Sequence, residues 1–393
     1  MRRFVPLALL AIAAYWLADH WIFAKRYGSF IANGYDPHVT PVDWYQPVYP
    51  LAHGAGSVLP AAAAPTIPQR LVDDVVAYAE AQHSMALIIV RHGRIELEKY
   101  WDDYSRESLF NPQSMAKTVL GMVTGIALAE GHIGSLDDPV GQYLDEWRDA
   151  PRGAITIRNL LTMSGGLAQI SEDYRPVPWS KGVWQHFGDD FNTPILNLAL
   201  VDPPGSRFDY NNNENNLLGM VLERATGSSY QDYVGEKLWA PLDLAPAYMY
   251  LDRLDGNVMK SCCIMSRPID WTKLGLLLLK DGRYGDRQVL PPGWVAQMTT
   301  PAPTFDGYGL QIWLEVGLDG SASEPPVSPQ AWWASETFAS EDVVHFLGFG
   351  FQHVWVIPSL DMVVVRANRV WPDEPWDQSR IPNLLIRGLR SAN

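Results

Sequence analysis

Segments typical of β-strands lie near both ends of this 393-residue chain, and a long stretch typical of helices and loops separates them. Ala86 to Val90 and Ile95 to Trp101 flank the turn His92-Gly93 and predict a hairpin. Near the other end, Val354 to Pro358 and Asp361 to Val365 carry the β-branched residues that strands favour. This order predicts an α+β fold, in which an antiparallel sheet is assembled from both ends of the chain and is flanked by helices.

The pattern along the chain divides it into an N-terminal segment, a linker and one folded domain. Residues 27–69 are rich in proline, glycine and alanine without helical or alternating periodicity, and we expect them to form a surface linker. Residues 70–393 are expected to form the folded domain, beginning with a helix from Arg70 to about His83. Within this domain, residues from about 109 to 259 predict a mostly helical lobe inserted into the sheet-containing lobe, and Tyr308 to Glu315 is expected to add a strand.

The N-terminal segment, residues 1–26, has the charge pattern of an export signal or a membrane anchor. Arg2-Arg3 precede Phe4 to Ala18, which contains no charged residue. Two arginines before an apolar run favour a cytoplasmic N-terminus and an exported domain. The preferred interpretation is an uncleaved anchor in the inner membrane over residues 4–24, with the folded domain facing the periplasm. A cleaved signal peptide and a buried helix of the soluble fold are the alternatives.

Ser114 and Lys117 stand three residues apart at the start of an apolar helical stretch that runs to about Glu130. Positions i and i+3 of an α-helix are neighbours, so a neutral lysine at this spacing can accept the serine proton. Asn111 to Gln113 supply a turn and a helix start just before the serine, where the helix dipole favours a developing negative charge. The pair indicates an activated nucleophile; a capping serine beside an exposed lysine is the alternative.

A second polar pattern, Tyr210-Asn211-Asn212, follows a turn rich in proline and glycine and precedes a helical stretch from Glu214 to Gly227. A phenol near a lysine ammonium is favoured in its ionised form. Tyr210 can therefore act as a base toward Ser114 and as an acid toward a leaving group. The alternative is a half-buried tyrosine in an asparagine-rich loop.

Together these motifs resemble those of the serine hydrolases related to class C β-lactamases and D,D-peptidases, in which Ser-x-x-Lys is followed later in the chain by Tyr-x-Asn. The segments ITIRNLLTMSGGL (residues 155–167), LLGMVLERATG (residues 217–227) and GLLLLKDG (residues 275–282) extend the resemblance. The resemblance implies a β-lactamase/transpeptidase-like fold, with the active site in a cleft between the helical lobe and the sheet lobe.

The resemblance also implies a role for each candidate residue. Ser114 attacks the substrate and forms an acyl-enzyme, and Lys117 and Tyr210 move the serine proton. Asn212 orients the lysine or the substrate. No cofactor and no metal are expected.

The chain departs from lactamases and peptidases at their third motif, Lys-Thr-Gly, which helps to hold a substrate carboxylate and is absent here. Lys280 to Gly282 is expected to be a surface turn instead. The better match is Gly348-Phe349-Gly350 before a strand, as in the esterase-like and 6-aminohexanoate-dimer-hydrolase-like branch. There the resemblance implies that the amide N–H of Phe349 joins that of Ser114 in an oxyanion hole, with glycines that let the backbone approach the substrate. A glycine-rich bend in a strand is the alternative.

Other chemistries find no support in the sequence. It contains no G-x-S-x-G, H-E-x-x-H or G-x-x-x-x-G-K-[ST] pattern, so α/β-hydrolase, metal and nucleotide chemistry are not indicated. A formal net charge of −14 without a basic run argues against nucleic acid as a partner. The only cysteines, Cys262 and Cys263, are adjacent, so we expect them to pack as small apolar residues without a disulfide between them.

We therefore predict an enzyme that cleaves a small-molecule ester or amide through an acyl-enzyme. The 16 tryptophans and 17 tyrosines offer aromatic walls for its pocket. A β-lactamase or D,D-peptidase is the alternative among enzymes, and a catalytically silent binding or sensor module on a membrane anchor is the alternative of another class. The sequence leaves the substrate, the preference for ester or amide, and the oligomeric state open.

Overall fold

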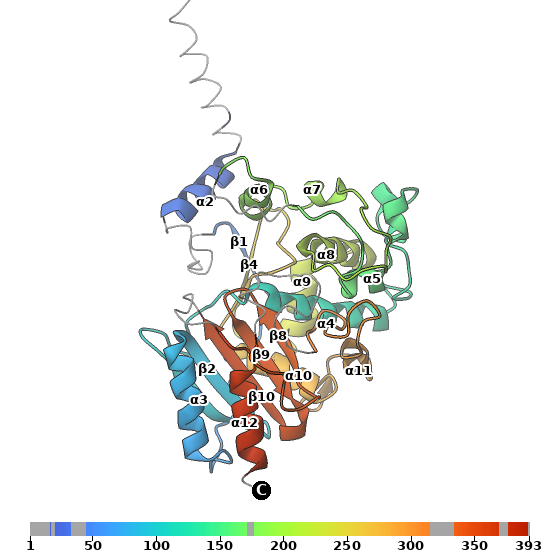
Figure 1. Cartoon of the computed structure of the whole chain (residues 1–393). Coiled ribbons are helices and arrows are strands. Elements are labelled where there is room, and N and C mark those ends of the chain that lie inside the picture. Colours follow the sequence, from blue (N-terminus) through green and yellow to red (C-terminus); the bar gives the residue numbers. More distant parts are fainter. Residues whose placement is uncertain are drawn as a thin grey trace, which may run out of the picture.

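In the computed structural model, a five-stranded antiparallel sheet forms from the two ends of the chain, in the order β3-β2-β10-β9-β8 (Figure 1). Its strands are β2 (Ser84–Arg91), β3 (Arg94–Tyr100), β8 (Val344–Gly348), β9 (Gln352–Ile357) and β10 (Met362–Asn368). β2 pairs with β10 so that Val90 lies opposite Val363. The predicted hairpin and the α+β class are confirmed. The structure describes residues 16, 20–32, 45–170, 177–314, 334–368 and 376–391.

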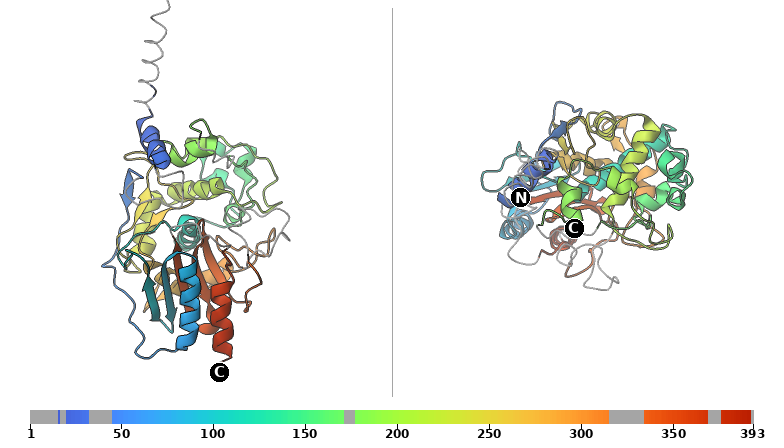
Figure 2. Two further views of the ribbon diagram at one scale, coloured as in Figure 1. Left: turned by 60° about the vertical axis from the view of Figure 1, so that its left-hand side comes forward. Right: turned by 90° about the horizontal axis from the view of Figure 1, so that it is seen from above.

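Both faces of this sheet are covered, because alternate residues along its central strands enter two different cores. Met362 and Val364 of β10 pack into the core below two helices that lie side by side, α3 and α12 (Figures 1 and 2). Val363 and Val365 belong to the larger core on the opposite face, which α10 covers. A continuous apolar run therefore suits a strand that is buried on both sides. The covering helices are α3 (Gln69–Ala81), α10 (Asp270–Leu279) and α12 (Arg380–Arg390).

The second lobe is mostly helical and is built around α4 (Ala116–Ala129), in which every residue from Ala116 to Ala127 is buried. A helix without a polar face suits this central place. The helical stretches predicted from Ser114 and from Glu214 are confirmed as η1 with α4 and as α8. The other elements of the lobe are η1 (Gln113–Met115), η2 (Val140–Gln142), η3 (Asp145–Trp147), η4 (Pro151–Ala154), α5 (Ile157–Leu161), α6 (Lys181–Phe187), α7 (Thr193–Leu196), α8 (Asn212–Thr226), α9 (Tyr230–Val234) and the π-helical turn η5 (Gly235–Trp239).

The remaining elements are short. They are the three-stranded sheet of β1 (Val48–Pro50), β4 (Tyr248–Tyr250) and β5 (Ile264–Met265), the hairpin of β6 (Arg283–Tyr284) and β7 (Arg287–Gln288), the helix α11 (Trp294–Met298) and the turn η7 (Pro358–Leu360).

The strand expected from Tyr308 to Glu315 is wrong for the residues that the structure describes, and Glu315 lies outside them. Tyr308 and Trp313 bridge one another, and Trp313 makes a further isolated bridge to His345 of β8. Gln311 between them has a φ of 62°, which turns the chain back on itself. The apolar pattern here belongs to a tight turn that packs aromatic rings, so it cannot run on as a strand.

The N-terminal residues that the structure describes pack against the helical lobe. α2 (Trp21–Ala32) lies beside α6, and the ring of Phe23 stacks on Trp184 with 3.8 Å between the centroids (Figure 1). Arg26 of α2 is buried, and its guanidinium lies 4.2 Å from the centre of the Tyr45 ring. It also donates a 2.8 Å hydrogen bond to the carbonyl of Gly188 in the helical lobe.

Residues 45–69, which fall within the segment expected to be a surface linker, contribute to this packing. Tyr45 and Leu51 are buried, and β1 pairs with β4 of the helical lobe. Within the described residues, no helix is both long enough and apolar enough to cross a membrane. Most of the anchor expected over residues 4–24 lies outside them.

Candidate active site

Ser114 lies in the turn η1 at the entrance of α4, and its hydroxyl contacts the amine of Lys117. The Nζ–Oγ distance is 2.8 Å, and Lys117 is 2% exposed. Gln113 has a φ of 52°, a conformation that residues other than glycine seldom adopt, and its amide donates to Asn111 Oδ1 at 3.0 Å. The turn predicted from the sequence is therefore present, and the residue directly before Ser114 has a strained backbone conformation.

The amine of Lys117 contacts two further groups. It donates a 2.8 Å hydrogen bond to the main-chain carbonyl of Ser261. It also lies 4.9 Å from the centre of the Tyr210 ring. The structure thus brings together Ser114, Lys117 and Tyr210, as the two sequence motifs predicted, and adds Ser261 to them.

Tyr210 is part of an aromatic cluster beside the serine. Its ring stacks on Trp313 at 5.5 Å and meets Tyr308 edge-on at 6.4 Å. Phe208 packs against the same cluster and is half-buried. Burial raises the pKa of Tyr308 well above its usual value, and the neighbouring Tyr210 adds to this rise. Tyr308 therefore keeps its proton.

The chain after Tyr210 enters α8 through a polar cap. The side chain of Asn211 accepts a hydrogen bond from the amide of Asn213 at 3.0 Å and donates to the carbonyl of Leu167 at 2.9 Å. Asn212 is the first residue of α8, and its Oδ1 is buried without a hydrogen-bond donor among the described residues. A buried amide oxygen without a donor suits contact with a substrate N–H. Its predicted role toward the lysine stays a prediction.

The glycine-rich run, Gly348 to Gly350, forms the turn between β8 and β9. It lies against η1, the turn that carries Ser114, here called the nucleophile turn. A Cβ on Gly348 would collide with the carbonyl oxygen of Pro112, so only glycine allows β8 to end so close to η1. Gly350 has a φ of 76°, and its carbonyl accepts a 3.0 Å hydrogen bond from the side-chain Nδ2 of Asn368 on β10. Phe349 is half-buried between these glycines. This placement is compatible with Phe349 N–H as an oxyanion donor, a role that stays a prediction.

The histidines near the run are not poised for proton transfer. His353 on β9 is fully buried, and its Nε2 accepts a hydrogen bond from Trp376 Nε1 at 3.1 Å. Burial, with His345 and Arg366 nearby, lowers the pKa of His353 well below its usual value. It therefore stays neutral as part of the packing of the sheet.

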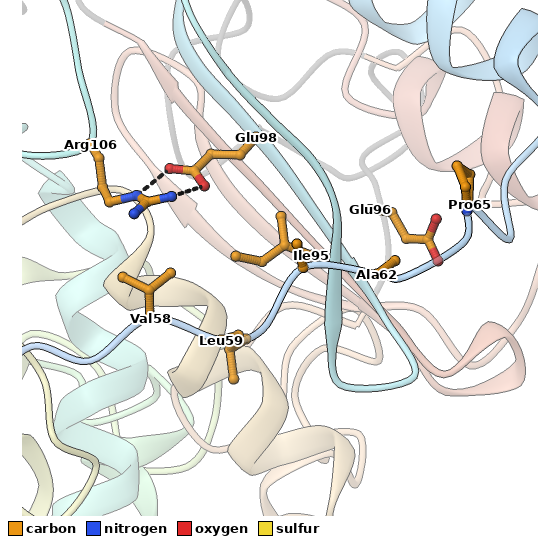
Figure 3. A pocket seen from close by; sticks show the side chains of 9 residues that line it. Val58, Leu59, Ala62, Pro65, Ile95, Glu96, Glu98 and Arg106 are labelled. Carbon is orange, nitrogen blue, oxygen red and sulfur yellow. Dashed lines mark hydrogen bonds and ion pairs between the residues drawn. The ribbon is translucent and has the colours of Figure 1, made fainter.

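A cavity of about 380 Å³ lies away from Ser114, on the opposite edge of the large sheet (Figure 3). The segment 58–65 and the edge strand β3 form its walls, and the ion pair between Arg106 and Glu98 closes one side. None of the candidate catalytic residues lines this cavity. It therefore does not belong to the candidate site.

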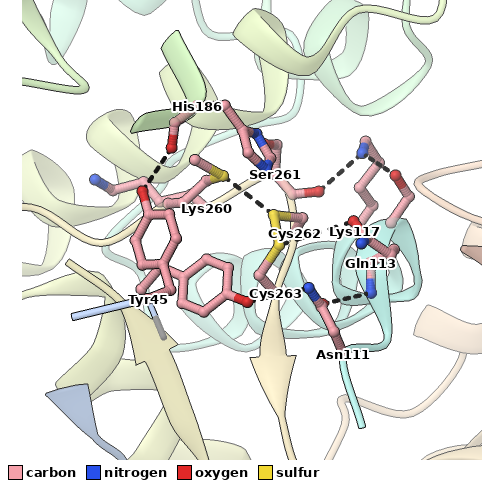
Figure 4. Close-up of a disulfide and its surroundings, with 12 residues drawn as sticks. Tyr45, Asn111, Gln113, Lys117, His186, Lys260, Ser261, Cys262 and Cys263 are labelled. Atoms are coloured by element: carbon pink, nitrogen blue, oxygen red, sulfur yellow. Dashed lines mark hydrogen bonds between the residues drawn. A yellow bond between two sulfur atoms is a disulfide. The ribbon is translucent and has the colours of Figure 1, made fainter. Parts of the chain in front are cut away.

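The expectation that Cys262 and Cys263 remain unbonded is wrong, because the structure joins them in a disulfide (Figure 4). Cys263 has a φ of 75°, and this unusual backbone lets the side chains of adjacent residues meet. The amide of Cys263 donates to the carbonyl of Gln113 at 3.3 Å. The disulfide thus lies directly beside the turn that carries Ser114.

Comparison with known proteins agrees with this geometry. The family model described as Beta-lactamase matches residues 69–381. The chain belongs to the β-lactamase family. Its resemblance to that family is thereby confirmed, and it is a serine hydrolase of the amidase and esterase type.

The similar proteins include 6-aminohexanoate-dimer hydrolases and a penicillin-binding protein. The 6-aminohexanoate-dimer hydrolase of Paenarthrobacter ureafaciens is 24% identical over 304 residues, which cover 73% of each chain. Penicillin-binding protein 4* of Bacillus subtilis is 28% identical over 155 residues, 37% of this chain and 32% of the relative. A suggested 6-aminohexanoate-dimer hydrolase from Bacillus anthracis has a TM-score of 0.68 at 19% identity, covering 91% of this chain and 92% of the other. This last likeness shows the fold.

The structure agrees with the expectation that Lys280 to Gly282 do not stand in for the Lys-Thr-Gly motif of lactamases. Lys280 to Gly282 form a turn after α10, with φ of 46° at Asp281 and 77° at Gly282. Lys280 pairs there with Asp361 at 2.5 Å. The expected surface turn is confirmed, and Lys280 does not replace the missing Lys-Thr-Gly lysine of the family.

Three residues near the site were not found from the sequence: Ser261, Asn216 and Glu214. Ser261 acts through its main-chain carbonyl, which no side-chain pattern reveals. Asn216 and Glu214 belong to α8 and are buried, although asparagine and glutamate seldom are. A polar run such as NNNENN at the start of a helix between apolar segments is a signal that could have pointed to them.

Glu214 ties the first turn of α8 to the loop at residues 165–167. Its carboxyl group is fully buried and accepts hydrogen bonds from the amides of Gly165 at 2.9 Å and Leu167 at 3.3 Å. Burial raises the pKa of Glu214 to about 8, and the charge of Asp209 adds to the rise, although the amide hydrogen bonds oppose it.

We expect Glu214 to make stability depend on pH. The pKa is 4.5 in the unfolded chain and about 8 in the folded protein, so only the folded protein keeps this proton between those values. Its contribution is complete below pH 4.5 and is lost as the pH rises to about 8. Urea unfolding at pH 5 and pH 8 should show a loss on the order of 2–4 kcal/mol in the wild type that Glu214→Gln lacks.

The matched control is Glu341→Gln, which changes an exposed glutamate and should follow the wild type at both pH values. An equal loss of stability in Glu214→Gln and the wild type would show that another group carries the pH dependence.

Proposed function

We propose that this chain hydrolyses an amide or ester bond of a small linear substrate through an acyl-enzyme on Ser114. The observation that carries the proposal is the buried amine of Lys117, 2.8 Å from Ser114 Oγ and bonded on its other side to the carbonyl of Ser261. An amine held against a serine hydroxyl in a site with little water can take its proton. A merely structural lysine would not need the serine as a partner.

The reaction follows from these contacts. Ser114 Oγ bonds to the substrate carbonyl carbon while its proton passes to Lys117 Nζ, and the carbonyl oxygen becomes an oxyanion near the amides of Ser114 and Phe349. As the bond to the leaving group breaks, Tyr210 relays the proton from Lys117 to it. A water molecule then attacks the acyl-enzyme, its proton returns along the same path to Ser114 Oγ, and the acid leaves.

The aromatic cluster supports a substrate with an apolar chain. Phe208 and Trp313 place rings around Tyr210, and such surfaces bind methylene groups well. Two of the similar proteins are named as 6-aminohexanoate-dimer hydrolases, whose substrate is a linear amide with methylene chains. We therefore propose linear amides as the first substrate class to test and activated esters as the second.

Replacing the nucleophile tests the proposal directly. We expect Ser114→Ala to lower kcat/KM for a p-nitrophenyl ester by roughly 10⁴-fold or more and to abolish labelling by a fluorophosphonate probe, because the variant lacks the hydroxyl that lies 2.8 Å from the Lys117 amine. Urea unfolding should stay cooperative, with a loss of no more than about 3 kcal/mol, the cost of removing one hydrogen-bond partner of a buried polar group.

Ser228→Ala, at the opposite end of α8 from Tyr210, serves as the control and should keep both activity and labelling. Substantial turnover by Ser114→Ala would refute the acyl-enzyme on this residue. A wild-type protein that no fluorophosphonate labels would favour the catalytically silent binding module.

The division of labour between Lys117 and Tyr210 can be measured by comparing leaving groups. Lys117→Ala should slow acylation by about 10²–10⁴-fold with esters and amides alike, because both need the serine proton removed. Tyr210→Phe keeps the ring and its packing on Trp313 but removes the hydroxyl. We expect it to cost more with amides, since an amine leaving group must be protonated, whereas a phenolate can leave unaided.

Tyr230→Phe is the matched control, because the Tyr230 hydroxyl is buried without a hydrogen-bond partner among the described residues and lies on α9. It should leave both rates unchanged. Equal losses with esters and amides in Tyr210→Phe would make Tyr210 the primary base.

A β-lactamase or D,D-peptidase is the second candidate, favoured by the match to a penicillin-binding protein. Against it, the stretch from β8 to the start of β9, residues 344–352, contains no lysine or arginine to hold a β-lactam carboxylate. We expect a fluorescent penicillin to label the protein at less than about a hundredth of the fluorophosphonate rate, the factor that a lost charged contact costs. Comparable rates would favour this candidate.

A further inference from the structure

A short segment from Lys260 to Cys263 crosses from α8 to the nucleophile turn (Figure 4). Its Ser261 carbonyl accepts the hydrogen bond from Lys117 Nζ at 2.8 Å. At its far end, the amide of Cys263 donates to the carbonyl of Gln113 at 3.3 Å. The segment therefore contacts both the lysine and the turn that carries Ser114.

The side chain of Asn216 on α8 holds the near end of this segment. Its Oδ1 accepts hydrogen bonds from the amides of Lys260 at 2.8 Å and Ser261 at 3.1 Å, and all three residues are buried. Lys260 then runs along α8, where a Cβ on Gly219 would collide with its side chain, and its amine pairs with Glu223 at 3.3 Å. One face of α8 thus binds both the main chain and the side chain of the segment.

The disulfide constrains the other end of the segment. Cys262 is 7% exposed and Cys263 is fully buried, and both pack into an apolar cluster with Met259, Met265 and Tyr250. A bond between adjacent cysteines closes a small ring that includes the peptide unit between them. The ring removes side-chain and backbone rotations that two separate thiols would keep.

The direction of the Lys117 amine decides whether it can act as a base. A neutral amine has two N–H groups and one lone pair. When one N–H is bound to the Ser261 carbonyl, the lone pair can be directed at Ser114 Oγ, which also lies 2.8 Å from the nitrogen. A carbonyl that moved would release the N–H and let the amine rotate away.

We propose that Asn216 and the Cys262–Cys263 disulfide are positioning groups, which together fix the Ser261 carbonyl and through it the orientation of Lys117. This inference rests on the proposed function of Lys117 as the base. It adds two groups that touch neither the substrate nor the reacting atoms, and it ties activity to the oxidised state of the cysteines.

The test compares Asn216→Ala with Asn216→Asp. Asn216→Ala removes the acceptor for both amides and should lower kcat for a p-nitrophenyl ester by about 10–100-fold with KM changed less than threefold, because a misdirected base affects the chemical step. Asn216→Asp keeps an oxygen acceptor and should recover most of kcat at high pH. The acid limb of its pH profile should lie at higher pH, since the added negative charge stabilises the lysine ammonium.

A second experiment tests the disulfide by comparing the wild type with the double variant Cys262→Ala/Cys263→Ala. A water-soluble phosphine takes up oxygen from water and becomes its oxide, while the sulfur–sulfur bond breaks and two thiols form. Reduction, counted by thiol titration, should lower wild-type kcat by about tenfold, and the double variant should be equally slow with or without the phosphine. If the buried bond resists reduction, the double variant alone decides this experiment.

Hydrogen exchange of the peptide that contains residues 260–263 separates this inference from the proposed function. Exchange should be faster in Asn216→Ala and in the double variant. It should not be faster in Asn215→Ala, because the Asn215 side chain donates from Nδ2 to Gln311 Oε1 and not to this segment. A wild-type kcat in both variants, or unchanged exchange, would overturn the inference. If Ser114 proved unreactive, the proposed function would be wrong. The exchange rates would still show whether Asn216 and the disulfide hold the segment at residues 260–263.

Discussion

A lysine amine buried at the start of an apolar helix needs polar partners that the helix cannot supply. Lys117 is 2% exposed, and its neighbours along α4 are apolar or small. Without partners, burying this amine would cost more than most single contacts return. Its partners include the hydroxyl of Ser114, in the turn just before the helix, and the carbonyl of Ser261, from a segment far along the chain. The arrangement of the site therefore depends on the tertiary packing of the helical lobe around Lys117.

Helix α8 organises this closure through buried polar side chains. Asn211 bonds to the carbonyl of Leu167, Glu214 to the amide of Gly165, and Asn216 to the amides of Lys260 and Ser261. Asn211 and Glu214 thus bind main-chain groups of the loop at residues 165–167, and Asn216 binds those of the segment at 260–261, groups that would otherwise be buried without partners. In this helix, polar residues of a kind that helices usually expose to solvent are buried, and they hold two loops in place near the serine.

The sheet supplies the other wall. Its central strands are buried on both faces, and its edge strand β8 ends at Gly348, against the carbonyl of Pro112. Because glycine has no side chain, the turn after β8 can lie directly beside the turn that carries Ser114. Arg366 on β10 donates to the carbonyl of Phe351 at 2.8 Å and steadies this turn from within the sheet. The candidate oxyanion donor Phe349 thus belongs to the sheet lobe, and the nucleophile lies where the sheet lobe meets the helical lobe.

Much of this arrangement could be predicted from the sequence, because it depends on local patterns. Alternation and β-branched residues predict the hairpin and the C-terminal strands, and the spacing of Ser114 and Lys117 follows from the helix period. Tyr210 and the glycine run were found through motifs whose residues lie close together in the chain. The strand expected at Tyr308 failed because a turn at Gln311 interrupts a pattern that looks extended.

Only the tertiary structure decided what surrounds these residues. Every residue has a main-chain carbonyl, whatever its side chain. The sequence therefore does not show that the carbonyl of Ser261 is a partner of Lys117. The bond between Cys262 and Cys263 depends on a backbone conformation that packing imposes at Cys263. The sequence by itself determined the strands, the helices and the chemical groups at the site. The distances between those groups were decided by long-range packing, because the contacts that set them join loops that no local pattern relates.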